Sequence, residues 1–241
     1  MGLEARSEAS ELRARAAEVL GRVERAARRA GRDPASVKLV AVSKTHPAAL
    51  VREAAESAGL REFGENRVQE AEAKIEELKE VPDLRWHLIG HLQPNKARRA
   101  VRLFDLIHTV DAAPLAERLE RICAEEGRAR LEVLVQMDLA GEATKSGATE
   151  AELPALFEVF GRCARVRCKG LMTLPPFSED VEQVRPFFRR LRELRDEWGA
   201  RGAFGEGPGE LSMGMSHDYE TAIEEGATLV RVGTAVFGER G

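Results

Sequence analysis

Lys44 is the residue whose position most plainly suggests chemistry. It follows an apolar run, VKLVAVS at 37–43, that is typical of a strand buried on both faces. By the alternation of side chains along a strand, Lys44 shares a face with Val40 and Val42. An amine at a desolvated strand end is nucleophilic enough to form an imine with an aldehyde. Position alone still favours an ordinary surface lysine, so the case depends on what lies near it.

Two later segments, LSMGMS at 211–216 and RVGT at 231–234, combine hydroxyl side chains with glycine directly after apolar runs. Glycine lets backbone N–H groups approach a ligand closely, and such loops followed by a helix N-terminus bind phosphate. Turn formation and capping explain each segment by itself, but two such loops together favour phosphate binding. The donors that these segments offer are Ser212, Met213, Gly214, Gly233 and Thr234.

Arg231 lies between Val230 and Val232 in the apolar run LVRV, so its side chain points to the face opposite both valines. If the valines pack against helices, the guanidinium enters the interior of the fold. A buried arginine requires a partner. The alternative to a ligand is an internal salt bridge with a strand-end carboxylate such as Glu65 or Asp111.

Three other polar residues follow predicted strands. Asn66, in FGEN, is either the N-cap of the next helix or a ligand contact. His87 and His91 flank the end of the third strand, and without further metal-like spacing they are interpreted as polar lining. No metal site is therefore expected.

The elements that must position these residues alternate regularly. Apolar runs of strand length are separated by helical patterns through about 200 residues, which predicts an α/β fold with a parallel sheet. Eight such runs favour a closed (β/α)8 TIM barrel over a doubly wound open sheet, because no GxGxxG or GxxxxGK[ST] follows any of them. An extra N-terminal helix at 3–30 is expected to cover the seam where a last helix is too short. The expected strands are 37–43, one ending at 63–64, 84–89, 104–110, 130–137, 165–172, one near 210–213, and 227–232.

Composition limits the class of protein. The 241 residues carry a net charge of −4 without long runs of one sign, so nucleic acid is not the expected partner. Three cysteines in no metal-like spacing suit a reducing compartment. The absence of a signal peptide or an apolar span predicts a cytoplasmic protein that does not enter membranes. One domain, 1–241, is expected, with an N-terminal helix at 1–36 and a barrel at 37–241.

The motifs VAVSKTHP, FGENRVQEAEAK, WHLIGHLQPNKA, GLMTLPP and LSMGMSHDYETAIEEGATLVRVGTAVFG together resemble the pyridoxal phosphate (PLP) homeostasis protein family, the YggS/PROSC type. The resemblance runs from about residue 37 to 238. It implies the alanine racemase-like barrel known as the type III PLP-binding fold. It further implies that Lys44 holds PLP as a Schiff base.

The resemblance also assigns roles to the other candidates. Arg231 would face the pyridine nitrogen, and Asn66 would lie near the cofactor. The phosphate would be held by Ser212, Gly233 and Thr234, with backbone around Met213 and Gly214.

The function expected from this resemblance is non-catalytic: PLP storage and delivery in vitamin B6 homeostasis. An arginine at the pyridine nitrogen makes the ring a weaker electron sink, and no second domain follows the barrel to complete a catalytic site. A small PLP-dependent amino-acid racemase of low activity is the alternative, and a cofactor-free Schiff-base aldolase is a third. The expected partners are PLP and apo PLP-dependent enzymes, and the expected state is a monomer.

Overall fold

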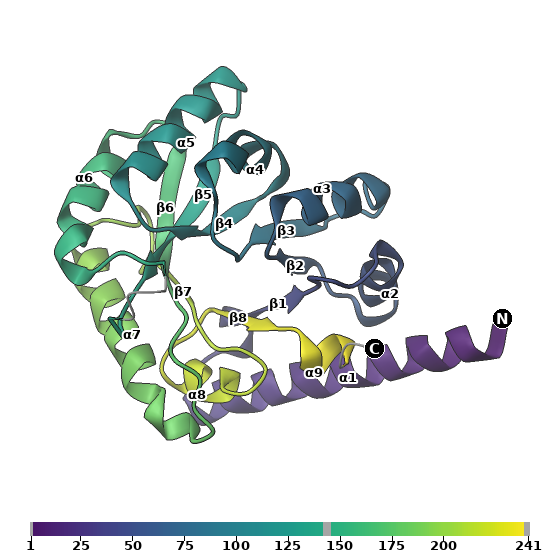
Figure 1. The fold of residues 1–241 in the computed structure, drawn as a ribbon. Coiled ribbons are helices and arrows are strands. Elements are labelled where there is room, and N and C mark those ends of the chain that lie inside the picture. Colours follow the sequence, from purple (N-terminus) through teal and green to yellow (C-terminus); the bar gives the residue numbers. More distant parts are fainter. Residues whose placement is uncertain (1, 142–145, 239–241) are drawn as a thin grey trace.

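Eight parallel strands close into one barrel in the order of the sequence, with β8 paired to β1 (Figure 1). The computed structural model describes residues 2–141 and 146–238. The closed barrel predicted from the alternation of strand and helix patterns is confirmed. The strands are β1 (Lys38–Val42), β2 (Glu62–Glu65), β3 (Arg85–Leu88), β4 (Leu106–Val110), β5 (Leu131–Met137), β6 (Val166–Thr173), β7 (Glu210–Ser212) and β8 (Leu229–Val232).

Helices cover the outside of the barrel, and each strand is followed by at least one helical segment. The described α-helices are α1 (Gly2–Arg29), α2 (Ala48–Ala58), α3 (Val68–Glu77), α4 (Ala97–Leu103), α5 (Ala113–Glu125), α6 (Leu153–Arg162), α7 (Arg185–Ala200), α8 (Tyr219–Glu224) and α9 (Thr234–Phe237). Short 3-10 turns are η1 (Pro34–Ser36), η2 (Pro94–Lys96), η3 (Glu150–Glu152) and η4 (Val181–Gln183).

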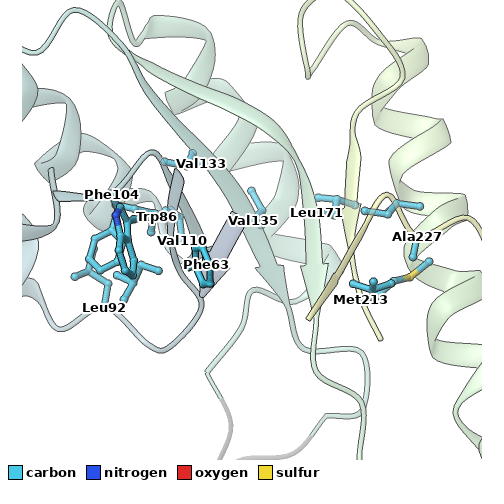
Figure 2. Close-up of a cluster of buried hydrophobic side chains, with 14 of the residues drawn as sticks. Phe63, Trp86, Leu92, Phe104, Val110, Val133, Val135, Leu171, Met213 and Ala227 are labelled. Atoms are coloured by element: carbon cyan, nitrogen blue, oxygen red, sulfur yellow. The ribbon is translucent and has the colours of Figure 1, made fainter. Parts of the chain in front are cut away.

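The core has two layers because side chains alternate along each strand. In β1, Leu39 and Ala41 belong to the large cluster between strands and helices, whereas Val40 belongs to a small cluster inside the barrel. The large cluster continues around the barrel through residues such as Phe63, Trp86, Val133 and Leu171 (Figure 2). The interior cluster is Val40, Leu106, Leu134, Met172 and Leu229.

The N-terminal helix α1 covers the seam between the first and last units, as the sequence predicts. It packs against α2, α8 and α9, and Leu12, Ala16 and Val19 are buried on its inner face. Arg15 adds a hydrogen bond from Nε to the carbonyl of Val236 at 3.1 Å. Each buried valine or leucine there contributes about 1.5–3 kcal/mol, so α1 belongs to the barrel energetically. In Figure 1 it runs beside α8 and α9, and its N-terminal end extends beyond them.

No helix in the described residues is both long enough and apolar enough to span a membrane. The described residues also hold no cluster of three or more His, Cys, Asp or Glu placed to bind a metal ion. The division into a helix at 1–36 and a barrel at 37–241 stays a prediction, and its ends, residues 1 and 239–241, lie outside the described residues.

Candidate functional site

Lys44 lies in a tight turn just beyond β1 and is half-buried. The residue after it, Thr45, has a φ of 68°, in the left-handed region that non-glycine residues rarely adopt. Backbone hydrogen bonds hold the turn: Ser43 N–H donates to the carbonyl of Gly64 at 3.0 Å, and His46 N–H donates to the carbonyl of Ser43 at 3.1 Å. Such strain persists only where the surroundings enforce it.

A buried lysine enforces this turn from the neighbouring helix α3. Lys74 Nζ donates to the Ser43 carbonyl at 2.6 Å and to Glu65 Oε1 at 2.7 Å. It also contacts Glu70, whose carboxylate accepts the N–H of Thr45. The residues on both sides of Lys44 are thus tied to one charged cluster. Burial raises the pKa of Glu65 above its ordinary value, although the hydrogen bonds from Lys74 and Ser43 act against that rise.

The loops after β7 and β8 meet the end of β1 at the same end of the barrel. Gly233 N–H donates to Ser216 Oγ at 3.3 Å, which joins the two loops. Gly233 also lies against β1, since a methyl group added to it would be 3.3 Å from the carbonyl oxygen of Val42. Thr234 follows and is exposed. The structure therefore brings Gly233 and Thr234 to the strand end that carries Lys44.

Met213 and Gly214, predicted as phosphate donors, also serve the packing of the last two strands. The N–H of Met213 donates a hydrogen bond to the carbonyl of Leu229 at 3.1 Å, and the Gly214 carbonyl accepts a hydrogen bond from the N–H of Arg231 at 3.0 Å. The Met213 side chain is fully buried in the outer core. Gly214 has a φ of 89°, and an added Cβ would lie only 2.6 Å from the Cβ of Ala222, so glycine allows α8 to pack closely.

Arg231 points into the barrel, as the flanking valines predict, since Val230 and Val232 belong to the outer cluster. It is 3% exposed, and its guanidinium donates to Ser212 Oγ at 2.6 Å and to the carbonyl of Thr173 at 2.9 Å. Because Ser212 and Thr173 end β7 and β6, the guanidinium lies near the carboxyl ends of the strands. Burial lowers the pKa of Arg231 to about 10, which leaves it a cation at neutral pH.

The predicted salt-bridge alternatives for Arg231 are wrong. Glu65 is paired with Lys74 at 2.7 Å. Asp111 lies 3.7 Å from Nδ1 of His91. Both carboxylates therefore already have nitrogen partners of their own, while Arg231 is held by neutral oxygen atoms.

Ser212 occupies a different environment from the one expected of a phosphate ligand. It is fully buried, and its hydroxyl lies between Arg231 and Nδ1 of His108, 2.8 Å away. Ser216, which ends the segment LSMGMS, is half-buried at the mouth beside Gly233. His108 was not singled out at all. The pattern LIHTV placed it on the inward face with Leu106, but no spacing in the sequence shows which strand it faces.

Asn66 lies beside a cavity of about 260 Å³ at the mouth of the barrel, together with His91 and Gln136. The predicted N-cap role is wrong, because α3 begins after Arg67 and has no side-chain cap. The backbone of Asn66 is close to Gly90, where an added Cβ would come within 2.2 Å of the Asn66 carbonyl oxygen. Asn66 is half-buried, so its amide is available to a ligand in this cavity.

The arrangement suits a small anion that carries a reactive carbonyl group. A lysine amine, a buried guanidinium, hydroxyl groups and a glycine N–H gather at one end of the barrel, where active sites of this architecture lie. The amine can attack a carbonyl carbon, and the neighbouring loops can donate hydrogen bonds to an anionic group.

Comparisons with known proteins agree with this geometry. Residues 17–241 match the family described as alanine racemase, N-terminal domain. The chain is 45% identical over 226 residues to the pyridoxal phosphate homeostasis protein of Aquifex aeolicus, covering 94% of this chain and 97% of the relative. Its identity to the protein of that name from Pseudomonas aeruginosa is 47% over 224 residues, covering 93% and 94% of the two chains.

Solved structures give the same result. PipY of Synechococcus elongatus PCC7942, with PLP bound, superposes with a TM-score of 0.78 at 45% identity, covering 90% of this chain and all of PipY. Alanine racemase from Corynebacterium glutamicum has a TM-score of 0.64 at 18% identity, covering 93% of this chain and 61% of the racemase, which supports the fold alone. On the strength of the full-length matches, this chain belongs to the pyridoxal phosphate homeostasis protein family, built on the alanine racemase N-terminal barrel.

Proposed function

We propose that this protein binds PLP at the mouth of the barrel, holds it covalently as a Schiff base on Lys44, and stores and delivers it without catalysing a reaction. The observation that carries the proposal is the meeting of three loops. Gly233 contacts Val42 near the Lys44 turn and donates to Ser216, so an amine and an anion cradle share one strand end. The relatives at 45–47% identity bear the name of PLP homeostasis proteins, and PipY was solved with PLP bound.

The residues present fit the chemical groups of PLP. When bound, PLP supplies an aldehyde carbon, and Lys44 provides the amine that attacks it. Ser216 and Thr234 would donate to the phosphate through their hydroxyl groups, and Gly233, whose N–H donates to Ser216 Oγ, would lie against it, because all three are at least partly accessible. Arg231 would donate to the ring nitrogen from inside the barrel.

Asn66, which follows β2 next to β1, would add its amide to the proposed site from beside the cavity lined by residues of and after β3 and β5. Ser212, Met213 and Gly214 support the site from behind, because their groups are bonded or packed within the barrel. This assignment changes the phosphate contact from Ser212 to Ser216 and keeps Gly233 and Thr234.

The non-catalytic part of the proposal is supported by two residues. Arg231 remains a cation, so it does not protonate the ring nitrogen and the ring stays a weak electron sink. Tyr219, the single tyrosine of the chain, is buried in α8 and lies under Arg22 of α1, with 5.4 Å from the guanidinium carbon to the ring centroid. It is therefore turned toward α1 rather than offered as a second base.

Apo PLP-dependent enzymes as recipients, a cytoplasmic location and a monomeric state remain predictions from the sequence. In the described residues, the exposed large apolar side chains are Leu20, Phe177 and Met215. Leu20 lies on α1 and the other two in loops, so this small set does not contradict a monomer.

The test is borohydride reduction of the protein after incubation with PLP, followed by peptide mass spectrometry. We expect one reduced PLP adduct, located on Lys44, and its loss in Lys44→Ala. Lys38→Ala is the matched control, because Lys38 is exposed at the other end of the same strand. A wild-type protein without an adduct on Lys44 would refute the covalent site. Turnover of an amino acid at about 1 s⁻¹ or faster would refute the proposal that the protein does not catalyse a reaction.

A further inference from the structure

Five polar side chains form one hydrogen-bonded chain through the barrel interior, from Glu62 on β2 to Arg231 on β8. Glu62 Oε2 lies 2.5 Å from His87 Nε2, and His87 Nδ1 lies 2.8 Å from His108 Nε2. His108 Nδ1 lies 2.8 Å from Ser212 Oγ, which accepts from Arg231 at 2.6 Å. The chain begins at the first residue of β2 and ends beside the proposed cofactor site.

All members except Glu62 are sealed from solvent. His87, His108, Ser212 and Arg231 are at most 3% exposed. The Glu62 side chain is 17% exposed at the other end of the chain. Every proton in the interior part must therefore be placed on a neighbour within the chain, because an unmatched donor or acceptor there is costly.

The direction of the hydrogen bonds follows from Glu62. Burial raises the pKa of its carboxyl group, but the hydrogen bond from His87, followed by nearby positive charges, outweighs burial and leaves that pKa lowered. Glu62 is therefore a carboxylate at neutral pH and can only accept. The proton between Glu62 and His87 must lie on Nε2 of His87. In a neutral imidazole, Nδ1 is then an acceptor, and His108 must donate to it from Nε2.

The hydrogen bond between His108 and Ser212 has a direction that follows from the one between His87 and His108. Complete burial, with the nearby charge of Arg231 acting in the same direction, lowers the pKa of His108 well below its ordinary value. His108 is therefore neutral, and its single N–H is already used toward His87. Its Nδ1 must accept the hydroxyl proton of Ser212. The Ser212 oxygen then offers only lone pairs to Arg231.

The reverse direction fails on proton placement. If His87 donated from both nitrogens, its Nδ1 proton would go to Nε2 of His108. His108 would then donate to Ser212 from Nδ1, as Arg231 does from its guanidinium. Within the described part of the chain, His108 and Arg231 are the hydrogen-bond partners that Ser212 Oγ has, so the hydroxyl proton would find no acceptor.

We propose that Glu62, His87 and His108 are positioning residues of the cofactor site. They set the direction of the hydrogen bonds, so that Ser212 turns its proton toward His108 and its lone pairs toward Arg231. The guanidinium that faces the ring nitrogen is thereby held in position. The role at the ring rests on the proposed function. The direction of the chain is a property of the protein alone and is testable without any ligand.

The direct test is nitrogen-15 NMR of the histidine side chains in the ligand-free protein at neutral pH. Imidazole nitrogen shifts distinguish N–H from bare nitrogen, and we expect His87 and His108 to be neutral with the proton on Nε2. His91, whose side chain is half exposed, is an internal reference for a solvated imidazole. A proton on Nδ1 of His108, or a doubly protonated His87, would overturn the proposal, whether or not PLP binds.

The second test measures how the chain acts on the site. In His108→Phe, PLP and pyridoxal should both bind about tenfold more weakly, because the loss is at the ring that they share. His108→Asn keeps an acceptor near Ser212 and should recover most of the affinity. Leu106→Met is the matched control, since Leu106 faces the same interior on the same strand.

The outcomes separate the two hypotheses. Unchanged affinity in His108→Phe, or a loss confined to PLP, contradicts the positioning role. Failure of the wild type to bind PLP contradicts the proposed function, while the tautomers found by NMR still decide the direction of the chain. Circular dichroism of each variant identifies a loss of folding, and in that case His108→Asn carries the test.

Discussion

Ser212 and Ser216 are close in the sequence but have opposite surroundings, and the surroundings decide what each hydroxyl can do. Ser212 is fully buried, and its oxygen and its proton are both used inside the barrel. Ser216 is half-buried at the mouth, where it accepts the Gly233 N–H at 3.3 Å and keeps its own proton free to donate. An anion at this end would therefore meet Ser216 before it met Ser212.

This difference predicts which ligand group each residue serves. The double variant Ser216→Ala with Thr234→Ala should weaken PLP by about 100-fold or more, since a hydrogen bond to a charged group contributes about 1.5–3 kcal/mol. The same variant should leave pyridoxal, which lacks the phosphate, almost unchanged. Equilibrium dialysis with both ligands measures the ratio.

Ser212→Ala should instead weaken PLP and pyridoxal by equal factors, because Ser212 acts through Arg231. Ser57→Ala is a control, since the Ser57 hydroxyl is bonded to its own helix at the Glu53 carbonyl. If Ser212→Ala affected PLP alone, Ser212 would be a phosphate ligand after all.

For single residues, the sequence predicted which way a side chain points better than which residues it contacts. The alternation in LVRV was enough to turn Arg231 inward, because the period of a strand is fixed. It could not show that Arg231 meets Ser212 and Thr173 rather than Glu65 or Asp111. Those contacts depend on the stagger between strands around the barrel, and the spacing of residues along one strand does not encode that stagger.

Helix α3 shows how one element supports another across the barrel wall. Its Lys74 side chain is only 8% exposed and reaches Glu65 on β2 and the Ser43 carbonyl after β1. A buried charge of this kind has stabilising value only while its partners are present. The turn that holds Lys44 is therefore secured by α3 as well as by its own backbone hydrogen bonds.

We expect Lys74→Met to lower the free energy of unfolding by about 3 kcal/mol, because it leaves the buried Glu65 without its cation. Lys79→Met is the matched control on the adjoining turn: its side chain is 60% exposed and pairs with the exposed Glu76, so its effect should stay within about 0.5 kcal/mol. Urea unfolding followed by circular dichroism measures both. Equal effects of the two substitutions would contradict the support assigned to Lys74.

The elements themselves were predicted closely, but their ends were not. Helix α3 begins at Val68, two residues after Asn66, and ends at Glu77, because Arg67 has extended backbone angles and Leu78 no longer has helical ones. The apolar period marks where a helix packs, while its ends depend on local backbone bonds. The role of Asn66 was misjudged for this reason.

The whole barrel buries its reactive sulfur atoms as well as its apolar core. Cys123, Cys163 and Cys168 are all buried and unpaired. Burial raises the pKa of the Cys163 thiol to about 11 and that of the Cys168 thiol to about 12. Because a raised pKa lowers the thiolate fraction at every pH below it, the folded protein should be poorly reactive toward alkylating reagents.

Iodoacetamide labelling at pH near 8 therefore should modify the folded chain slowly, and all three cysteines quickly in urea. Mass spectrometry after timed quenching gives the rates. Labelling should accelerate as the pH rises toward the two thiol pKa values, even while the protein stays folded. Fast labelling of the native chain at pH near 8 would contradict the packing of β6, which carries Cys168.

The closed barrel was predictable from the sequence because eight apolar runs separated by helical patterns admit few arrangements. The chain of polar side chains inside it was not predictable. His87 was interpreted as lining and His108 was passed over, since each is an unremarkable residue in its own strand. Only the closure of the barrel brings together the strands that carry these polar side chains, which are β2, β3, β4, β7 and β8.

The position of α1 has a consequence for how the molecule is made. This helix is synthesised before the eight strands, but α8 and α9, which cover much of its apolar face, come late in the order of elements. Leu12, Ala16 and Val19 therefore lack their final neighbours until α8 and α9 have been made. The barrel beside Lys44 closes only when β8 pairs with β1, so the proposed cofactor site cannot form on a nascent chain before β8 has been made.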